Sequence, residues 1–172
     1  KPVTAIGAEA FKGIRDIGAV VIPDSVTVIE AGAFRNCVNL TEITMSNSVT
    51  TIGKEAFAYC NQVKAITLPE TLTTISEGAF AFCRNLRSID IPDSVQTIGD
   101  YAFQVCASMK TATFGTGLRT IGEKAFWDCA ALTSVVIPDG APTTIGKKAF
   151  YGCKSLKEIS MPKSLKTIDK MA

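Results

Sequence analysis

Phenylalanine recurs at a fixed interval along the whole chain, and this interval constrains the fold more than any other feature. Each step is 23 residues long except the last, which is 24. A unit of this size cannot bury its own apolar face, so neighbouring units must stack and share one core. We therefore predict that residues 1–172 form a single solenoid domain of about seven repeats. The repeated residues are Phe11, Phe34, Phe57, Phe80, Phe103, Phe126 and Phe150.

Each repeat contains two patterns that predict local structure. The first is an apolar series whose gaps of four, one, three and three residues fit one face of a short helical segment. The second is a period-two alternation that predicts a short strand, as at 43–45, 66–68, 89–91 and 135–137. Equivalent strands of stacked units lie side by side, so the sheet is expected to be parallel. One example of the apolar series is Ile75, Ala79, Phe80, Cys83 and Leu86.

Composition excludes several classes of function. Eighteen Lys and Arg against sixteen Asp and Glu leave a net charge of +2, too small and dispersed for a nucleic-acid footprint over the whole chain. No apolar run approaches the ~18 to 20 residues that would span a bilayer, so this segment is not expected to insert into a membrane. The chain has no histidine, which excludes Ser-His-Asp and Cys-His catalysis. We expect no catalytic residues and no enzymatic activity.

Six cysteines occupy the same position in successive repeats. Equivalent positions in stacked coils lie about 5 Å apart, beyond the Cβ separation that a disulfide prefers. A straight ladder also cannot wrap four thiolates around one zinc ion. Buried thiols are therefore favoured over disulfides and over a metal site, and no cofactor is expected. The six are Cys37, Cys60, Cys83, Cys106, Cys129 and Cys153.

The middle residue of each strand should face outward, where it can contact a partner. These residues form a polar row that includes Thr67 and Asp90, flanked by Lys64, Arg87 and Lys110. Strands and helical turns differ in width, so the stack is expected to curve with the strand row on its concave side. We predict these five residues as one candidate protein-binding surface.

A second candidate surface consists of Trp127 and Tyr151. Each directly follows the repeated Phe, about 170° around a helical wheel from the core-facing centre. The two side chains should therefore be exposed and adjacent on the convex side. Exposed paired aromatic residues can form a contact surface, although drift among repeats would also account for them.

The repeat written as A-F-x-x-C-x-x-L-x-x-I-x-I-P-x-S-V-x-x-I-G resembles the BspA-like leucine-rich repeats, and the likeness covers essentially all 172 residues. The resemblance implies a right-handed α/β solenoid, with a parallel sheet of short strands on the concave side and short helical turns on the convex side. It also implies a cell-surface or secreted protein of gut or oral bacteria, or of some protozoan parasites. Family members are associated with adhesion, so a host matrix protein or another bacterial surface protein is the implied partner. The resemblance carries over no catalytic residue.

These observations favour a non-enzymatic protein-binding or adhesion module. The alternative is a structural spacer or an intracellular scaffold solenoid without its own ligand. Both ends cut through the repeat frame, so we expect the chain to be a fragment of a longer protein. Terminal coils without polar caps expose core edges, and self-association through these ends is expected.

Overall fold

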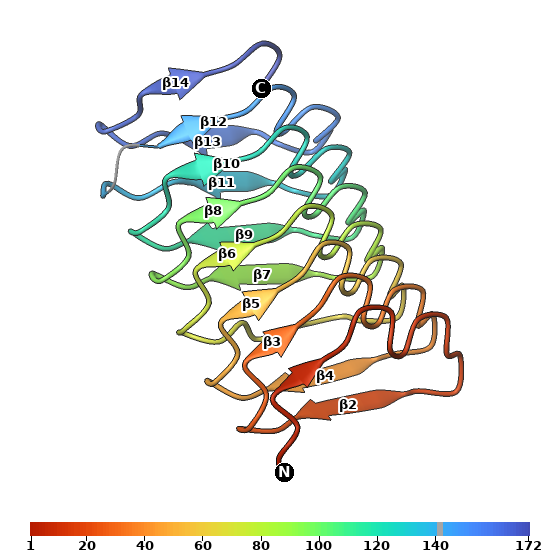
Figure 1. Ribbon diagram of the computed structural model, residues 1–172. Helices are drawn as coiled ribbons and strands as arrows, with labels where there is room; N and C mark the ends of the chain where they lie inside the picture. The colour runs from red at the N-terminus through yellow and green to blue at the C-terminus, as the bar shows by residue number, and fades with distance from the viewer. Residues whose placement is uncertain (141–142) are drawn as a thin grey trace.

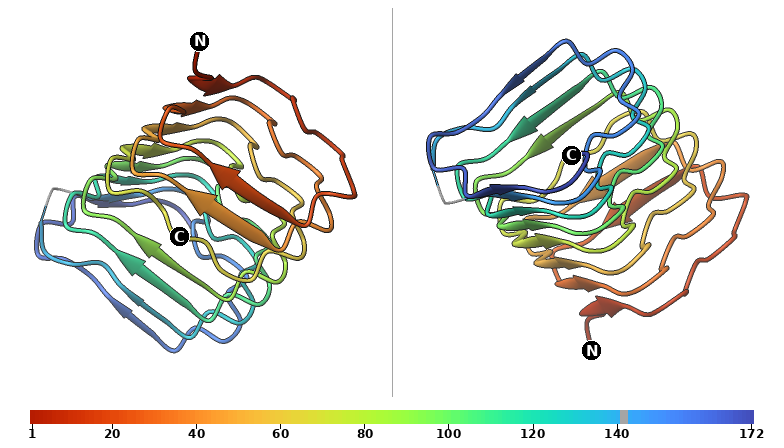
Figure 2. Two further views of the ribbon diagram at one scale, coloured as in Figure 1. Left: turned by 90° about the horizontal axis from the view of Figure 1, so that it is seen from below. Right: turned by 90° about the horizontal axis from the view of Figure 1, so that it is seen from above.

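The computed structural model describes residues 1–140 and 143–172, which form a parallel β-solenoid with its two termini at opposite ends (Figure 1). Successive coils follow nearly the same path when the molecule is seen from above or below (Figure 2). The predicted solenoid is thus confirmed. The strands are Ala5–Ile6 (β1), Ala19–Ile22 (β2), Val28–Ile29 (β3), Glu42–Met45 (β4), Thr51–Ile52 (β5), Thr74–Ile75 (β6), Ser88–Ile91 (β7), Thr97–Ile98 (β8), Thr111–Phe114 (β9), Thr120–Ile121 (β10), Ser134–Val136 (β11), Thr144–Ile145 (β12), Glu158–Ser160 (β13) and Thr167–Ile168 (β14).

Two-residue strands form one continuous sheet along the solenoid. Its order is β1-β3-β5-β6-β8-β10-β12-β14, and each pair is parallel. Most of these strands read Thr-Ile, and the register places like on like, as in Thr74 opposite Thr97 and Ile75 opposite Ile98. The isoleucine of each inner strand is buried while the preceding residue is partly or fully exposed. Successive side chains of these strands therefore point to opposite sides of the sheet, with the isoleucine toward the core.

The longer strands lie on another side of the solenoid. We call the outward side of β2, β4, β7, β9, β11, β13 and residues 65–68 the strand face. These strands pair in parallel in two separate sheets, β2-β4 and β13-β11-β9-β7. The strand predicted at 66–68 is wrong, because this segment has no ladder partner on either side. Ile66 and Leu68 are nevertheless buried and Thr67 is exposed. Alternation predicts which side chains point inward, and it does not establish that the backbone is paired.

The repeated phenylalanines form a stack through the centre of the molecule. Rings of successive coils lie 5.1 to 5.5 Å apart and nearly parallel, with interplanar angles of 14° or less. The five from Phe34 to Phe126 are at most 1% exposed. Ile, Leu and Val side chains of the three sheets and of the segments between the strands pack around these rings in one continuous cluster. One core thus runs through the described coils, as the repeat length predicts.

The helical turns predicted on the convex side are wrong, since the described residues contain no helix. The backbone N–H groups here alternate between two kinds of partner. Phe57 N–H donates to the carbonyl of Ala79 in the next coil at 2.8 Å, whereas Ala58 N–H donates to Glu55 three residues back at 3.1 Å. Residues two before and two after each Phe have positive φ, as Glu55 (53°) and Tyr59 (64°) do. Left-handed residues at this spacing break the i to i−4 bonding of a helix, and the segment becomes a chain of β-turns.

Gly99 shows why glycine recurs just before these turns. A Cβ atom on Gly99 would lie 2.7 Å from the backbone nitrogen of Glu77 and 2.8 Å from the carbonyl carbon of Ser76 in the preceding coil. We expect Gly99→Ala to lower the free energy of unfolding by about 1–3 kcal/mol, because overpacking displaces backbone. Gly18→Ala is the control, since nothing lies within 4 Å of its added Cβ. Equal urea midpoints for both variants would contradict the close approach of the coils.

The coils at both ends are less completely buried than those between them. Phe11 is 38% exposed at the first end, and Ile168 and Met171 are 53% and 50% exposed at the other. These apolar side chains have no further coil of the described chain beside them. Self-association through the ends therefore stays a prediction.

Candidate functional site

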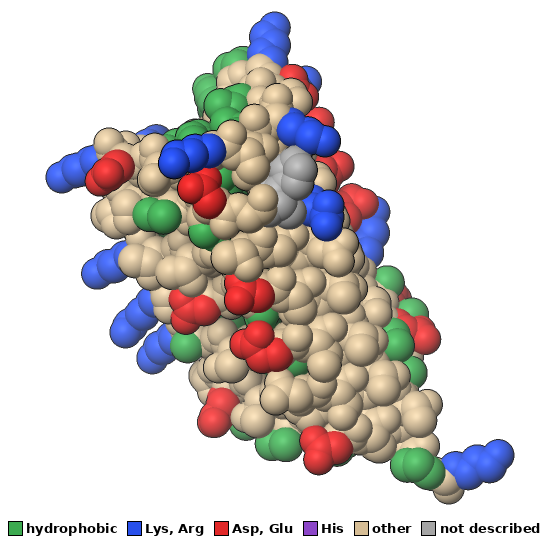
Figure 3. Space-filling model, turned by 90° about the vertical axis from the view of Figure 1, so that its left-hand side faces the viewer, with side chains coloured by type: hydrophobic (Ala, Val, Ile, Leu, Met, Phe, Trp, Pro, Cys, Tyr) green, Lys and Arg blue, Asp and Glu red, His purple; other side chains and the backbone are tan. Residues whose placement is uncertain are grey.

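Three basic side chains lie side by side at the edge of the strand face, directly before residues 65–68, β7 and β9. Lys64, Arg87 and Lys110 are all exposed. The Arg87 N–H donates to the Lys64 carbonyl at 3.0 Å, and the Lys110 N–H donates to the Arg87 carbonyl at 2.8 Å. These two bonds hold the residues on consecutive coils, so their charges form one continuous row, which we call the basic row. In Figure 3, several Lys and Arg side chains project from the left-hand edge of the molecule, and Asp and Glu side chains lie both in the middle of the view and along the right-hand edge.

Polar groups and two hollows adjoin the basic row. A hollow of about 440 Å³ lies between β4 and residues 64–67, and its lining includes Lys64 and Thr67. Another of about 390 Å³ lies between residues 66–68 and the ends of β7 and β9, and its lining includes Thr67 and Asp90. Thr67 thus separates two depressions where the sheet is interrupted. The Thr113 hydroxyl donates to Asp90 Oδ1 at 2.6 Å and fixes this carboxylate on the surface.

The strand-face candidates are therefore brought together, although the two hollows involve them unequally. Lys64, Thr67 and Asp90 line the hollows, whereas Arg87 and Lys110 extend the basic row beside them. The basic row suits acidic groups of an extended polar partner, because exposed charges steer association. The hollow at Asp90 has the opposite charge, since Glu70, Asp90 and Asp93 line it and no basic residue of the described chain does.

Trp127 and Tyr151 lie on neighbouring coils, but they differ in exposure. Tyr151 is 47% exposed, while Trp127 is half-buried, and the Asp128 N–H donates to the Tyr151 carbonyl at 2.8 Å. The Lys148 ammonium lies 5.5 Å from the centre of the Tyr151 ring. The expected exposure of Trp127 came from a helical wheel, and there is no helix here. Of the two, Tyr151 offers the more accessible ring.

The cysteines form a column of free thiols beside the phenylalanine stack, and all but the half-buried Cys153 are buried. Each thiol donates a hydrogen bond to the Phe carbonyl of the preceding coil, as Cys83 does to Phe57 at 3.2 Å. Burial raises the pKa of the Cys83 thiol from its ordinary value of 9.0 to about 12, which keeps it protonated and unreactive at neutral pH. Sequence analysis missed this hydrogen bond, because a thiol resembles any small apolar residue in a repeat.

Neither a membrane-spanning helix nor a metal-binding cluster emerges from the described chain. Across residues 1–140 and 143–172, no helix has the length and apolar character that a bilayer span requires. Over the same ranges, no three His, Cys, Asp or Glu side chains are grouped so that they could hold a metal ion.

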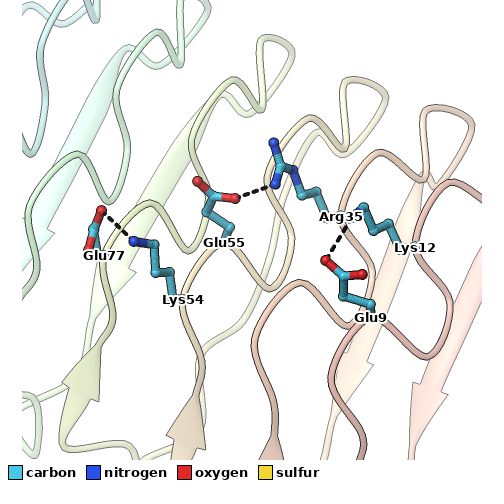
Figure 4. A network of polar contacts seen from close by, with 6 residues as sticks. All are labelled: Glu9, Lys12, Arg35, Lys54, Glu55 and Glu77. Carbon is cyan, nitrogen blue, oxygen red and sulfur yellow. Dashed lines mark hydrogen bonds and ion pairs between the residues drawn. The ribbon is translucent and has the colours of Figure 1, made fainter.

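Ion pairs run along the turn face, which we define as the outward side of the turns around each repeated Phe (Figure 4). Arg35 pairs with Glu55 of the next coil at 2.7 Å, and Lys54 pairs with Glu77 at 3.0 Å. The side chains of these four residues are between 34% and 55% exposed. Pairs this exposed contribute little to stability, so partners can exchange within them at small cost. Sequence analysis did not single out this surface.

Comparison with solved structures finds bacterial leucine-rich repeat proteins. A leucine rich cell surface protein from Faecalibacterium prausnitzii A2-165 is 35% identical with a TM-score of 0.82, over 92% of this chain and 42% of that one. A T. pallidum leucine rich repeat protein is 28% identical with a TM-score of 0.72, over 97% of this chain and 67% of that one. A leucine-rich repeat protein from Eubacterium ventriosum ATCC 27560 is 26% identical with a TM-score of 0.69, over 87% and 50%. This chain therefore spans 42% to 67% of their lengths.

A comparison with curated proteins finds no significant match. The model of the BspA type Leucine rich repeat region matches in six copies over residues 1–106 and 73–172, and so covers the whole chain. The resemblance inferred from the repeat is thereby confirmed. With its stacked coils, its Phe and Cys columns and this match, the chain belongs to the BspA-type leucine-rich repeat family.

Proposed function

We propose that this chain is a non-enzymatic protein-binding module of a bacterial cell-surface or secreted protein, and that it binds its partner through the strand face. The observation that carries the proposal is the continuous basic row of Lys64, Arg87 and Lys110, exposed beside Asp90 and the two hollows. An extended array of charged and hydroxyl groups can contact many residues of a protein at once. Tyr151 and Trp127 form a second, smaller candidate surface on the turn face.

The location and the type of partner rest on similarity. The 35% identical structure is described as a cell surface protein, which supports a surface or secreted location for this chain. A host matrix protein or a surface protein of another bacterium is the proposed partner. Acidic segments of such proteins would complement the basic row.

Charge reversal on the strand face tests the proposal. With immobilised matrix proteins and bacterial surface proteins, Arg87→Glu combined with Lys110→Glu should slow association by about tenfold at low salt and weaken its salt dependence. Trp127→Ala combined with Tyr151→Ala should weaken binding by about 30-fold if these rings anchor the partner. Binding kinetics should be measured by surface plasmon resonance at several ionic strengths.

The control is Lys163→Glu combined with Lys166→Glu, which makes the same change in net charge at exposed positions away from the basic row. A partner that binds both test variants and wild type equally would exclude both surfaces. If no extracellular protein binds at all, the chain acts as a spacer and the proposal is wrong.

A further inference from the structure

One edge of the strand face carries basic residues and no acidic ones over several coils. The basic row continues past Lys110, because the Thr133 N–H donates to the Lys110 carbonyl and the Lys157 N–H donates to the Thr133 carbonyl, both at 3.1 Å. We call residues 61–66, 84–89, 107–112, 130–135 and 154–157 the basic strip. No Asp or Glu occurs in its sequence. Its cations are Lys64, Arg84, Arg87, Lys110, Lys154 and Lys157.

The charges of the basic strip are not neutralised by the chain itself. All of its cations are exposed, and none of them takes part in an ion pair within residues 1–140 and 143–172. Arg84 lies over the Phe82 ring, with its guanidinium carbon 5.8 Å from the ring centre, and this contact brings no carboxylate to it. On the turn face, by contrast, Arg35 and Lys54 are paired with glutamates of neighbouring coils. The strip therefore presents positive charge that an anionic ligand can neutralise.

Acidic side chains mark the limits of the strip. The column directly after the basic row is small and neutral in the inner coils and acidic only in coils nearer the two ends. From the first coil to the last it reads Ala19, Glu42, Ala65, Ser88, Thr111, Ser134 and Glu158. Farther along the strands lies the acidic hollow at Asp90. A polyanion that crossed the strand face would meet this hollow, so the row favours a polyanion that runs from coil to coil along the solenoid axis.

The spacing of the row favours a ligand with closely spaced anionic groups. Neighbouring coils of paired strands lie about 4.8 Å apart, so the row from Lys64 to Lys157 extends over about 19 Å. An extended acidic peptide alternates its side chains between two sides, so only every second carboxylate would face the row. A sulfated polysaccharide carries anionic groups on successive sugar rings. The hydroxyl groups of Ser88 and Thr111 lie beside the row, where they can donate to sulfate oxygens.

The strip lacks the side chains that two other kinds of polyanion require. Nucleic-acid strands stack their bases on exposed aromatic rings, and membrane surfaces take up exposed apolar side chains. Among the described residues, no large apolar side chain of the strip is exposed. A ligand that binds through charge and hydrogen bonds alone fits this surface better.

We propose that the basic strip binds a linear sulfated polysaccharide that runs along the solenoid axis. Lys and Arg side chains of successive coils donate charge-assisted hydrogen bonds to its sulfates. Binding releases counterions, so the affinity falls as the salt concentration rises. The proposal rests on the basic row of the proposed function, and it names a polysaccharide instead of a protein as the ligand of that row.

Isothermal titration calorimetry with a heparin octasaccharide at several salt concentrations tests the proposal. The logarithm of its association constant should fall linearly with the logarithm of the salt concentration. Two matched probes separate the sources of affinity. The first is the same octasaccharide without its sulfates, and the second is an octaglutamate peptide. Both should bind at least about tenfold more weakly than the sulfated probe at low salt.

Variants connect the binding to the row. Lys64→Gln combined with Lys110→Gln should weaken octasaccharide binding by about tenfold at low salt and reduce its salt slope by about two. Thr133→Lys adds a cation at the neutral, exposed position of the row, so it should strengthen binding by about threefold and raise the slope by about one. The control is Lys163→Gln combined with Lys166→Gln. It makes the same change in net charge at exposed positions outside the strip and should alter affinity by less than about twofold.

The proposal is wrong if the octasaccharide does not bind at low salt, or if its desulfated form binds equally well. Equal losses in the test and control variants would assign the affinity to the general charge of the chain and would also contradict it. Octaglutamate binding as tight as that of the octasaccharide would assign the row to acidic protein segments. That result would overturn the polysaccharide and leave the proposed function in place, because protein partners stripped of their glycans are measured separately.

Discussion

Replacing Phe80 by alanine is expected to lower the free energy of unfolding by about 3–5 kcal/mol. The ring is 1% exposed and stacks between Phe57 at 5.5 Å and Phe103 at 5.4 Å. Its removal leaves a cavity between two coils, and these coils cannot collapse onto the cavity without bending the sheets they belong to. In a solenoid, this loss also weakens the interface on each side of the altered coil. Chemical denaturation followed by circular dichroism measures the effect.

Phe11→Ala provides a matched control within the same column. Phe11 is 38% exposed and stacks on one neighbour, Phe34, at 5.1 Å. Its loss should reduce stability by about 1–2 kcal/mol, because less apolar surface returns to water. If Phe80→Ala shifted stability by less than Phe11→Ala, the central stack would not be the main source of cohesion between coils.

The coil itself could be predicted from the sequence because its evidence is repeated seven times. A 23-residue period fixes the length of one coil, and Phe, Cys and Ile at fixed positions mark the side that faces the core. In the structure these positions are buried in every inner coil. A departure from the pattern in one repeat, such as Ile14 in place of the first Cys, does not change the register of the other six units.

The helical turns were predicted wrongly because one apolar spacing is compatible with two backbones. The apolar residues of each repeat stand at relative positions 0, 4, 5, 8 and 11. A helix and a chain of β-turns both place these five positions on one side. A distinguishing signal was available two residues after the repeated Phe. Gly13, Asn36, Asp128 and Gly152 stand there in four of seven units, and these types favour left-handed backbone. The other three units have Tyr59, Phe82 and Val105 at this position. These residue types do not favour left-handed backbone, so the pattern was not recognised.

The two candidate surfaces differed in how far the sequence could define them. Period-two alternation placed Thr67 and Asp90 on the outside correctly, and Lys64, Arg87 and Lys110, which were predicted to flank that row, are exposed as well. The Trp127 and Tyr151 surface was defined less well, because its residues were placed with a helical wheel and the described residues contain no helix. The helical wheel gave both rings the same exposure, whereas in the chain of turns Tyr151 is exposed and Trp127 is half-buried.

A second large effect is expected at alkaline pH, where the cysteine column should destabilise the fold. Desolvation is the main cause that raises the pKa of Cys60, Cys83, Cys106 and Cys129 above their ordinary value of 9.0. Below pH 9 these thiols are protonated in both states and contribute no pH dependence. Above pH 9 the unfolded chain loses their protons while the folded chain keeps them, so the free energy of unfolding falls as pH rises.

The expected slope is steep because four buried thiols act together. Each lowers the free energy of unfolding by about 1.4 kcal/mol per pH unit, so the four together remove about 5–6 kcal/mol per unit. This loss is comparable to the whole stability of a typical domain. For Cys83, whose folded pKa is about 12, it continues up to that pH. The chain should therefore unfold reversibly between about pH 9 and pH 11 in the presence of a reductant.

The variant Cys60→Ala combined with Cys83→Ala isolates the thiols from other groups that titrate in this range. It should be less stable than wild type at pH 7, because two buried side chains and their hydrogen bonds to Phe34 and Phe57 are lost. Its free energy of unfolding should nevertheless fall less steeply as pH rises, with a slope of about 3 kcal/mol per pH unit for the two thiols that remain. All other residues are the same in the two chains, so their contributions cancel in the comparison. Urea unfolding at half-unit steps from pH 8 to pH 11 measures both slopes, and identical slopes would show that the thiols ionise as readily in the folded coil as in the unfolded chain.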